Sequence, residues 1–202
     1  MNSGKAARSC MAAVAALLAF PSTASAHLTI QGAGDLGNGA LHPLATPSHV
    51  LILLSLAILL GRRVPLDLKF AMLVLAPASA AALLLTTTGG VNGVAQPFLI
   101  GLALVIAALV ALDVDPSREF IAGLCAAAAI GIGLDSGVES AGAAAVAKGL
   151  SGTWLSMNLL TGYVALCVSN GAEKPWARIA MRVAGSWIIA ISLMMLAFSL
   201  RK

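Results

Sequence analysis

The 202-residue sequence is poor in charge, since only 10% of its residues are Asp, Glu, Lys or Arg. A soluble domain typically carries about 25% charged residues, so a water-soluble globular protein is excluded. Cysteine is scarce as well, and three cysteines are too few for a disulfide scaffold. The 12 basic and 8 acidic residues leave a net charge of +4, which is too sparse to indicate a partner among the nucleic acids.

Apolar side chains, by contrast, are abundant: 59% of the residues are hydrophobic and the mean hydropathy is +0.96. A helix needs about 20 apolar residues to cross the hydrocarbon core of a bilayer, and residues 27–202 have room for six such helices. The sequence therefore predicts an all-α, polytopic transmembrane bundle of six spans. The six apolar runs cover residues 44–60, 68–88, 95–112, 120–134, 150–169 and 179–200.

The first 26 residues have the three parts of a secretory signal peptide: a basic start, an apolar run over residues 10–20, and a small-residue cleavage site at 24–26. We predict that this segment is cleaved, which leaves residues 27–202 as one six-helix transmembrane domain that begins at His27. The alternative is an uncleaved first helix, although its apolar run is short for a span. The Gly-rich residues 27–41 are expected to form a short lead-in outside the membrane.

An external N-terminus determines on which side of the membrane each loop lies. The inner loops would then hold six basic residues, and the outer loops and the tail only three. This excess agrees with the positive-inside rule, so we predict a multi-pass protein of the bacterial inner membrane with its mature N-terminus outside. The six basic residues are Arg62, Arg63, Lys69, Arg118, Lys174 and Arg178.

Small residues recur every four positions in the fourth apolar run, at Gly123, Ala127 and Gly131. Such spacing lets two helix backbones approach closely in lipid, where packing replaces the hydrophobic effect as the main force of association. We therefore expect this stripe to be a helix-packing face.

Two histidines flank the start of the first predicted span, His42 and His49, and both lie near prolines, Pro43 and Pro47. Seven residues are two helical turns, so the two imidazoles would stand about 10.5 Å apart along a straight helix. One metal ion with bonds of about 2 Å to nitrogen could not reach both. A break at either proline would shorten that distance.

Two carboxylates, Asp135 and Glu139, close the fourth span and are expected on the same outer side as the histidines. Polar groups at membrane depth are costly and are candidates for function. Two imidazoles and two carboxylates that converge from two helices would suit a transition-metal ion such as nickel, cobalt or zinc. In the alternative interpretation the histidines only bond to a neighbouring loop, and Asp135 only accepts from backbone amides of a wet Gly-rich turn.

An enzyme is not predicted, because the sequence contains no nucleophile–base pair, no phosphate-binding glycine loop and no zinc-protease motif. No organic cofactor is expected either.

The chain resembles the HupE/UreJ family, the membrane proteins associated with hydrogenase and urease gene clusters. The first-span motif of that family is His-Pro-x-x-Gly-x-Asp-His. His42-Pro43 and His49 match it at the same spacing, while Thr46 and Ser48 stand where the motif has Gly and Asp.

A second family motif, Phe-His-Gly-x-Ala-His-Gly-x-Glu, aligns with residues 131–139. Gly133, Gly137 and Glu139 match, whereas the two motif histidines fall on Ile132 and Ser136. Asp135 occupies a position at which the family has a small residue. Three side chains that could bind metal are therefore missing from the two motifs, and Asp135 supplies one oxygen donor in their place.

The resemblance implies a cleaved signal peptide, about six spans and a role as a permease for Ni²⁺ or Co²⁺ or as a metal-sensing accessory. The implied partners are the lipid bilayer, the divalent ion itself and the maturation machinery of a metalloenzyme. Loss of the two imidazoles removes ligands that favour nickel over magnesium or calcium.

Two hypotheses follow. The first is a permease or metal-delivery protein with His42, His49, Asp135 and Glu139 at an outer entry site. The second is a non-transporting membrane scaffold that keeps only remnants of the motif, in which a His49–Asp135 hydrogen bond is structural. Because buried polar groups recruit partners, both predict that the first and fourth spans are neighbours, with His49 and Asp135 in contact.

Overall fold

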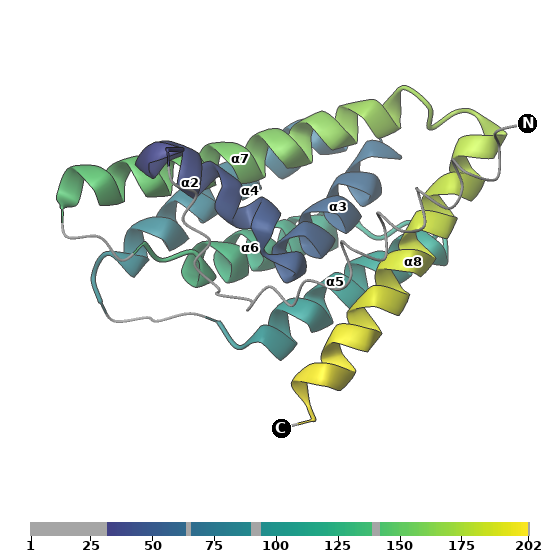
Figure 1. Cartoon of the computed structure of the whole chain (residues 1–202). Helices are drawn as coiled ribbons and strands as arrows, with labels where there is room; N and C mark the ends of the chain where they lie inside the picture. The colour runs from purple at the N-terminus through teal and green to yellow at the C-terminus, as the bar shows by residue number, and fades with distance from the viewer. Residues whose placement is uncertain (1–31, 64–65, 90–93, 139–141, 202) are drawn as a thin grey trace, which may run out of the picture.

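The computed structural model describes residues 32–63, 66–89, 94–138 and 142–201, and within these ranges it holds seven helices and no strand (Figure 1). The helices are α2 (Gly34–Ala45), α3 (Pro47–Gly61), α4 (Leu66–Thr86), α5 (Gln96–Ala111), α6 (Arg118–Asp135), α7 (Ala143–Ser169) and α8 (Pro175–Ser199). The all-helical part of the fold prediction is therefore confirmed.

Helix α3 is the centre of the bundle. It packs mainly against α5 and α7, while the remaining helices form the pairs α2–α7, α4–α6 and α5–α8 around it. The helix is apolar on every side, as expected for a helix surrounded by others, and most of its side chains are excluded from solvent. The fully buried members include Ile52, Leu53, Leu56, Leu59 and Leu60.

Backbone contact between glycines holds α2 against α7. A Cβ atom on Gly39 would lie 1.9 Å from the Gly149 carbonyl oxygen, and one on Gly152 would lie 2.1 Å from the Leu36 carbonyl oxygen. Thr153 of α7 also donates a hydrogen bond of 2.9 Å to the Gly39 carbonyl. Only glycine permits so close an approach, so these residues fix the position of α2.

Residues 34–41 of the expected external lead-in belong to helix α2, while the side of the membrane on which they lie remains a prediction. Their Gly-rich composition has weak helix propensity, but packing against α7 overrides it. The first predicted span, 44–60, is likewise not one straight helix. Helices α2 and α3 meet at Thr46 with a bend of 75°.

The other helices begin and end within a few residues of the predicted runs, except that α7 begins at Ala143 rather than at residue 150. Two of the described helices are long and apolar enough to cross a membrane, α4 over residues 68–86 and α8, and the bent pair α2–α3 is a third if it counts as one span. Six spans remain a prediction. The signal peptide 1–26 and the mature terminus His27 lie outside the described residues.

The predicted small-residue stripe is wrong at Gly123, where an added Cβ atom would meet nothing within 4 Å. The stripe does make a close contact at Gly131, whose Cβ would lie 2.9 Å from Leu99 Cδ2 in α5, and a further one occurs outside it at Gly133, whose Cβ would lie 2.6 Å from the Cβ of Ala82 in α4. The four-residue spacing therefore identified one close contact, at Gly131, and not the contact of α6 with α4 at Gly133.

Candidate metal centre at the break between α2 and α3

Thr46 is the break. Its backbone is extended (φ −96°, ψ 108°), and Pro47 follows as the first residue of α3. Proline lacks an N–H and disfavours helical backbone in the residue before it. Pro43 in α2 and Pro77 in α4 are accommodated inside helices, whereas at Pro47 the preceding residue is extended and one helix ends there. The Thr46 N–H and hydroxyl both donate to the His42 carbonyl, at 3.1 and 3.0 Å, and cap the end of α2.

The break brings the two predicted histidines together. The ring centroids of His42 and His49 are 5.6 Å apart, with the rings edge to face at 66°. A straight helix would separate these residues by about 10.5 Å along its axis. The predicted effect of a proline break is thus confirmed, and Pro47 is the proline at the break, whereas Pro43 lies inside α2.

His49 also meets the carboxylate that the sequence placed beside it. Its Nε2 lies 2.9 Å from Asp135 Oδ2, so the expected contact between the first and fourth predicted spans is confirmed. His49 is fully buried, whereas Asp135 is 27% exposed at the end of α6. The other carboxylate oxygen accepts a 3.3 Å hydrogen bond from the Val94 N–H. Asp135 therefore joins α6 both to α3 and to the segment before α5.

The contact determines which ring nitrogen of His49 faces the rest of the site. An ionised carboxylate only accepts hydrogen bonds, so an ionised Asp135 keeps the ring proton on Nε2. Nδ1 then carries the lone pair, and it is buried with no hydrogen-bond partner among the described residues. A histidine with one nitrogen held by a carboxylate and the other open has the arrangement typical of a metal ligand.

The four predicted ligands are placed only in part. His42 lies beside His49 at the break and His49 contacts Asp135, while Glu139 lies outside the described residues. Among the residues that the structure describes, no three His, Cys, Asp or Glu side chains are grouped so that together they could hold a metal ion. The described site consists of two imidazoles and a carboxylate that orients one of them.

Two serines complete the polar surroundings, and both stand at motif positions. Ser136 is buried and donates a 2.7 Å hydrogen bond to the Ile132 carbonyl of its own helix. Ser48 is buried beside His49, and its hydroxyl has no partner in the described part of the chain. The motif alignment identified these positions, but it gave no indication of their burial.

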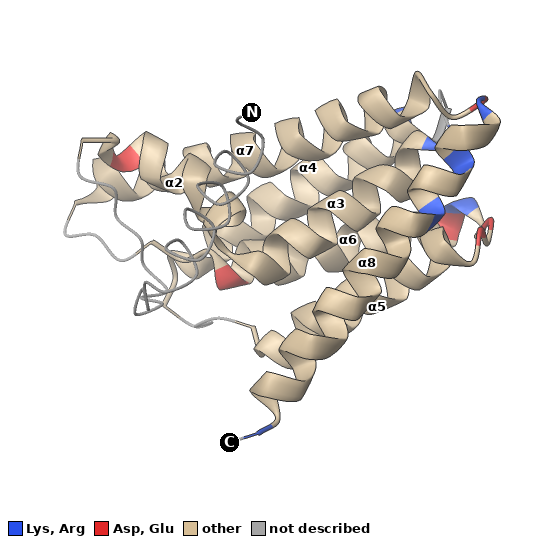
Figure 2. Ribbon diagram, turned by 45° about the vertical axis from the view of Figure 1, so that its right-hand side comes forward, with Lys and Arg blue, Asp and Glu red and all other residues tan. Residues whose placement is uncertain are grey.

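A cluster of charges lies at the opposite end of α3 (Figure 2). Arg62 and Arg178 both bond to Asp113, at 3.1 and 2.6 Å, and Arg63 pairs with Asp115 at 2.5 Å. Arg62 follows α3 directly, so about 20 Å of helix separates it from His49. Three of the six basic residues assigned to inner loops therefore gather at one end of the molecule, away from the histidines.

Apolar helices that surround a buried imidazole, which is paired with a partly exposed carboxylate at a helix break, define an all-helical membrane protein with a polar centre near one end. The sequence matches the family described as HupE / UreJ protein over residues 15–195, and the chain belongs to that family. Comparison with curated proteins and with solved structures gave no match.

Proposed function

We propose that this protein is an accessory membrane protein of hydrogenase or urease maturation, and that it binds a divalent transition-metal ion, Ni²⁺ or Co²⁺, at the break between α2 and α3. The ion is cargo, carried across the membrane or delivered to the maturation machinery, and no catalytic step is assigned to the chain. The observation that supports this function best is the 75° bend that places His42 and His49 5.6 Å apart.

The donor chemistry supports a borderline-soft cation. Imidazole suits nickel, copper and zinc more than it suits magnesium or calcium. Metal–nitrogen bonds of about 2 Å require two donor nitrogens to come within roughly 4 Å of each other, so the two rings, whose centroids are 5.6 Å apart, would have to turn toward a shared ion. The buried Nδ1 of His49 supplies one donor, and His42 supplies the second.

The two carboxylates, Asp135 and Glu139, have different roles in this proposal. Asp135 holds the His49 ring through Nε2, which increases the basicity of the other nitrogen and adds a negative charge beside a dication. Glu139 follows four residues later and remains the predicted oxygen ligand. The C-terminal ends of α2 and α6 also lie at the break, and their partial negative charge favours a cation.

The proposed orientation follows from the charges. The arginines at one end of the bundle support a multi-pass protein of the inner membrane with that end inside. The histidines then lie toward the outer side, where an ion would enter. Discontinuous helices at membrane depth recur as ion sites in transporters, which supports the same interpretation.

A scaffold is the second candidate, and one observation favours it: the 2.9 Å bond between His49 and Asp135 already satisfies one nitrogen of a buried histidine without any ion. In this case the pair would only fasten α3 to α6. Metal transport and metal binding would both be absent.

The two candidates are separated by accumulation of radiolabelled nickel and cobalt in cells that produce each variant, measured against an empty-vector control. We expect uptake by the wild type, loss with His49→Ala and weakening with Glu139→Gln, whereas His27→Ala serves as a histidine control and should retain uptake. If wild type and His49→Ala both equal the empty vector, the purified wild type binds no Ni²⁺ in titration calorimetry, and His49→Ala lowers the unfolding temperature, the scaffold is correct.

A further inference from the structure

A cavity of about 450 Å³ lies at the start of α8, at the charged end of the molecule and away from the histidines. Its volume is in the range of sites for small ligands. We propose that this cavity binds the headgroup of an anionic phospholipid and that the exposed apolar face of α8 holds the acyl chains. The residues that line it are Asp113, Glu173, Pro175, Arg178, Ile179 and Arg182.

One arginine at the cavity, Arg182, has hydrogen-bond donors that the surrounding ion pairs do not use. Asp113 is already shared between Arg62 and Arg178, at 3.1 and 2.6 Å. Arg182 donates its Nε to the Ala111 carbonyl at 3.0 Å. Its charge acts on nearby Asp113, and Glu173 also lines the cavity, but among the described residues no carboxylate forms an ion pair with Arg182. Its two terminal nitrogens therefore remain available to a phosphate, for which a guanidinium fork is well shaped.

The second arginine is placed to assist. Arg178 and Arg182 are four residues apart on α8, so they lie on the same helix face. Arg178 is 64% exposed even though it bonds to Asp113, which leaves part of its guanidinium open to the cavity. Together the two side chains can hold one phosphate group between them.

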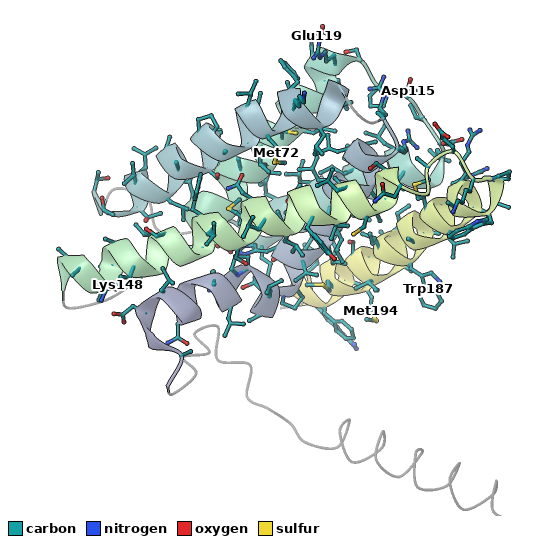
Figure 3. The ribbon with its side chains drawn as sticks, turned by 90° about the horizontal axis from the view of Figure 1, so that it is seen from above. Met72, Asp115, Glu119, Lys148, Trp187 and Met194 are labelled. Atoms are coloured by element: carbon teal, nitrogen blue, oxygen red, sulfur yellow. The ribbon has the colours of Figure 1, made fainter. Side chains whose placement is uncertain are left out.

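An apolar surface continues from the cavity along α8. Ile179, Val183 and Trp187 are 65%, 50% and 67% exposed, although α8 is apolar and long enough to cross a membrane. Figure 3 shows Trp187 and Met194 pointing away from the neighbouring helices. A free phosphate would make no use of this surface, whereas a phospholipid would cover both the cavity and the face below it.

The position of the cavity at the charged end of the bundle also agrees with a phospholipid ligand. Arginines gather at this end of the bundle, and basic pockets between membrane helices recognise anionic headgroups such as those of phosphatidylglycerol and cardiolipin. Trp176, which is 65% exposed in the first turn of α8, lies where aromatic residues meet the membrane surface. The proposal depends on the membrane class of the protein and not on metal binding.

The test is native mass spectrometry of the purified full-length protein after it is offered equal amounts of phosphatidylglycerol or cardiolipin and of phosphatidylcholine. We expect the wild type to retain the anionic lipids preferentially. Arg182→Gln should reduce this preference about fivefold, as expected for the loss of one basic contact near a membrane surface, and Arg182→Lys should reduce it less. The matched control is Arg201→Gln at the far end of α8, which should leave the preference unchanged.

Several outcomes would overturn the proposal. Equal retention of anionic and zwitterionic lipid would do so, as would an Arg182→Gln variant that binds like the wild type. Millimolar inorganic phosphate should not displace the lipid, and if it did, the site would be one for a free anion. If Arg182→Gln fails to fold, the folded Arg182→Lys variant decides, and an unchanged preference in that variant would be incompatible with bidentate arginine binding.

Discussion

His49 Nε2 and Asp135 Oδ2 lie 2.9 Å apart although 86 residues separate them in the sequence. The pair joins the first turn of α3 to the last residue of α6, and it does so at the point where α2 and α3 meet at an angle. Because the histidine is fully buried and the carboxylate is partly exposed, the contact connects the interior of the bundle with its surface.

The first prediction concerns this pair. Asp135→Asn removes the charge and leaves a single oxygen for two donors, the His49 ring and the Val94 N–H. If metal binds at the break, affinity for Ni²⁺ should fall about 10- to 100-fold, the usual effect of losing a carboxylate that orients a histidine ligand. Titration calorimetry on the purified protein measures it. Asp35→Asn, at an exposed position in α2, is the matched control, and equal affinities for the two variants would contradict the role given to Asp135.

The second prediction concerns the close contact between α2 and α7. Gly39→Ala would place a methyl group 1.9 Å from the Gly149 carbonyl oxygen, so the helices must separate. Overpacking of this kind typically costs about 1–3 kcal/mol. The free energy of unfolding in detergent should fall by at least that amount. Gly101→Ala is the control because its new methyl group meets nothing within 4 Å, and it should be neutral or stabilising by up to about 1 kcal/mol.

The break and its pair of histidines could be predicted because proline acts through local chemistry that is visible in the sequence. The same holds for the apolar runs, since their length and composition already determine α4, α5, α6 and α8. Helix α2 could not be predicted. Its stability comes from residues such as Thr153, which contacts Gly39 across 114 positions, and a Gly-rich stretch has no local signal that identifies such a partner.

The close helix contacts show the same limit. The spacing of Gly123 and Gly131 is that of a packing stripe, but only the arrangement of the neighbouring helices decides which glycines touch a backbone. Gly123 meets nothing, whereas Gly185, with no such pattern, would place a Cβ 2.9 Å from the Ala111 nitrogen. The His49–Asp135 contact was predictable for a different reason, because a buried polar group requires a partner and few were available.

The third prediction concerns the interface between α4 and α7. Trp154 donates its indole N–H to the Ala76 carbonyl at 2.9 Å, and Asn158, one turn later, donates to Ser79 at 3.3 Å. Hydrogen bonds between membrane helices contribute about 0.6 kcal/mol on average, and up to about 1.7. Trp154→Phe should therefore lower the free energy of unfolding by about this amount plus the effect of lost ring volume.

The control for this variant is Trp187→Phe, which makes the same chemical change on a side chain that is 67% exposed. It should leave the unfolding curve unchanged in detergent. Equal effects of the two substitutions would show that the Trp154 hydrogen bond does not stabilise the contact between α4 and α7.

The fourth prediction is a pH dependence at the charged end. The hydrogen bond from Arg178, followed by the positive charges of Arg178 and Arg62, holds the pKa of Asp113 below its ordinary value of 3.8. Since the pKa is lower in the folded state, the stabilisation is complete above pH 3.8 and is lost as the pH falls through the lower folded value. The difference in unfolding temperature between wild type and Asp113→Asn should thus shrink below pH 3.8. A difference that persists at lower pH would contradict the ionic origin of the effect.

The last prediction tests the family motif directly. Ser48 is buried at the position where the motif has an aspartate, and its hydroxyl has no partner among the described residues. Ser48→Asp places a carboxylate beside His49, where without metal it is a buried charge and should lower the unfolding temperature. Nickel would neutralise that charge, so we expect millimolar Ni²⁺ to restore the unfolding temperature and the variant to accumulate more radiolabelled nickel than the wild type.

Ser55→Asp is the matched control, since it puts the same charge in the same helix two turns away. Ser55 donates hydrogen bonds to the carbonyls of Leu51 and Ile52 in its own helix. The Ser55→Asp variant should be destabilised to a similar degree, and its unfolding temperature should not respond to nickel. If Ser48→Asp also fails to respond and the wild type accumulates no more nickel than the empty vector, the break between α2 and α3 is not a metal site, and the contact of His49 with Asp135 is structural.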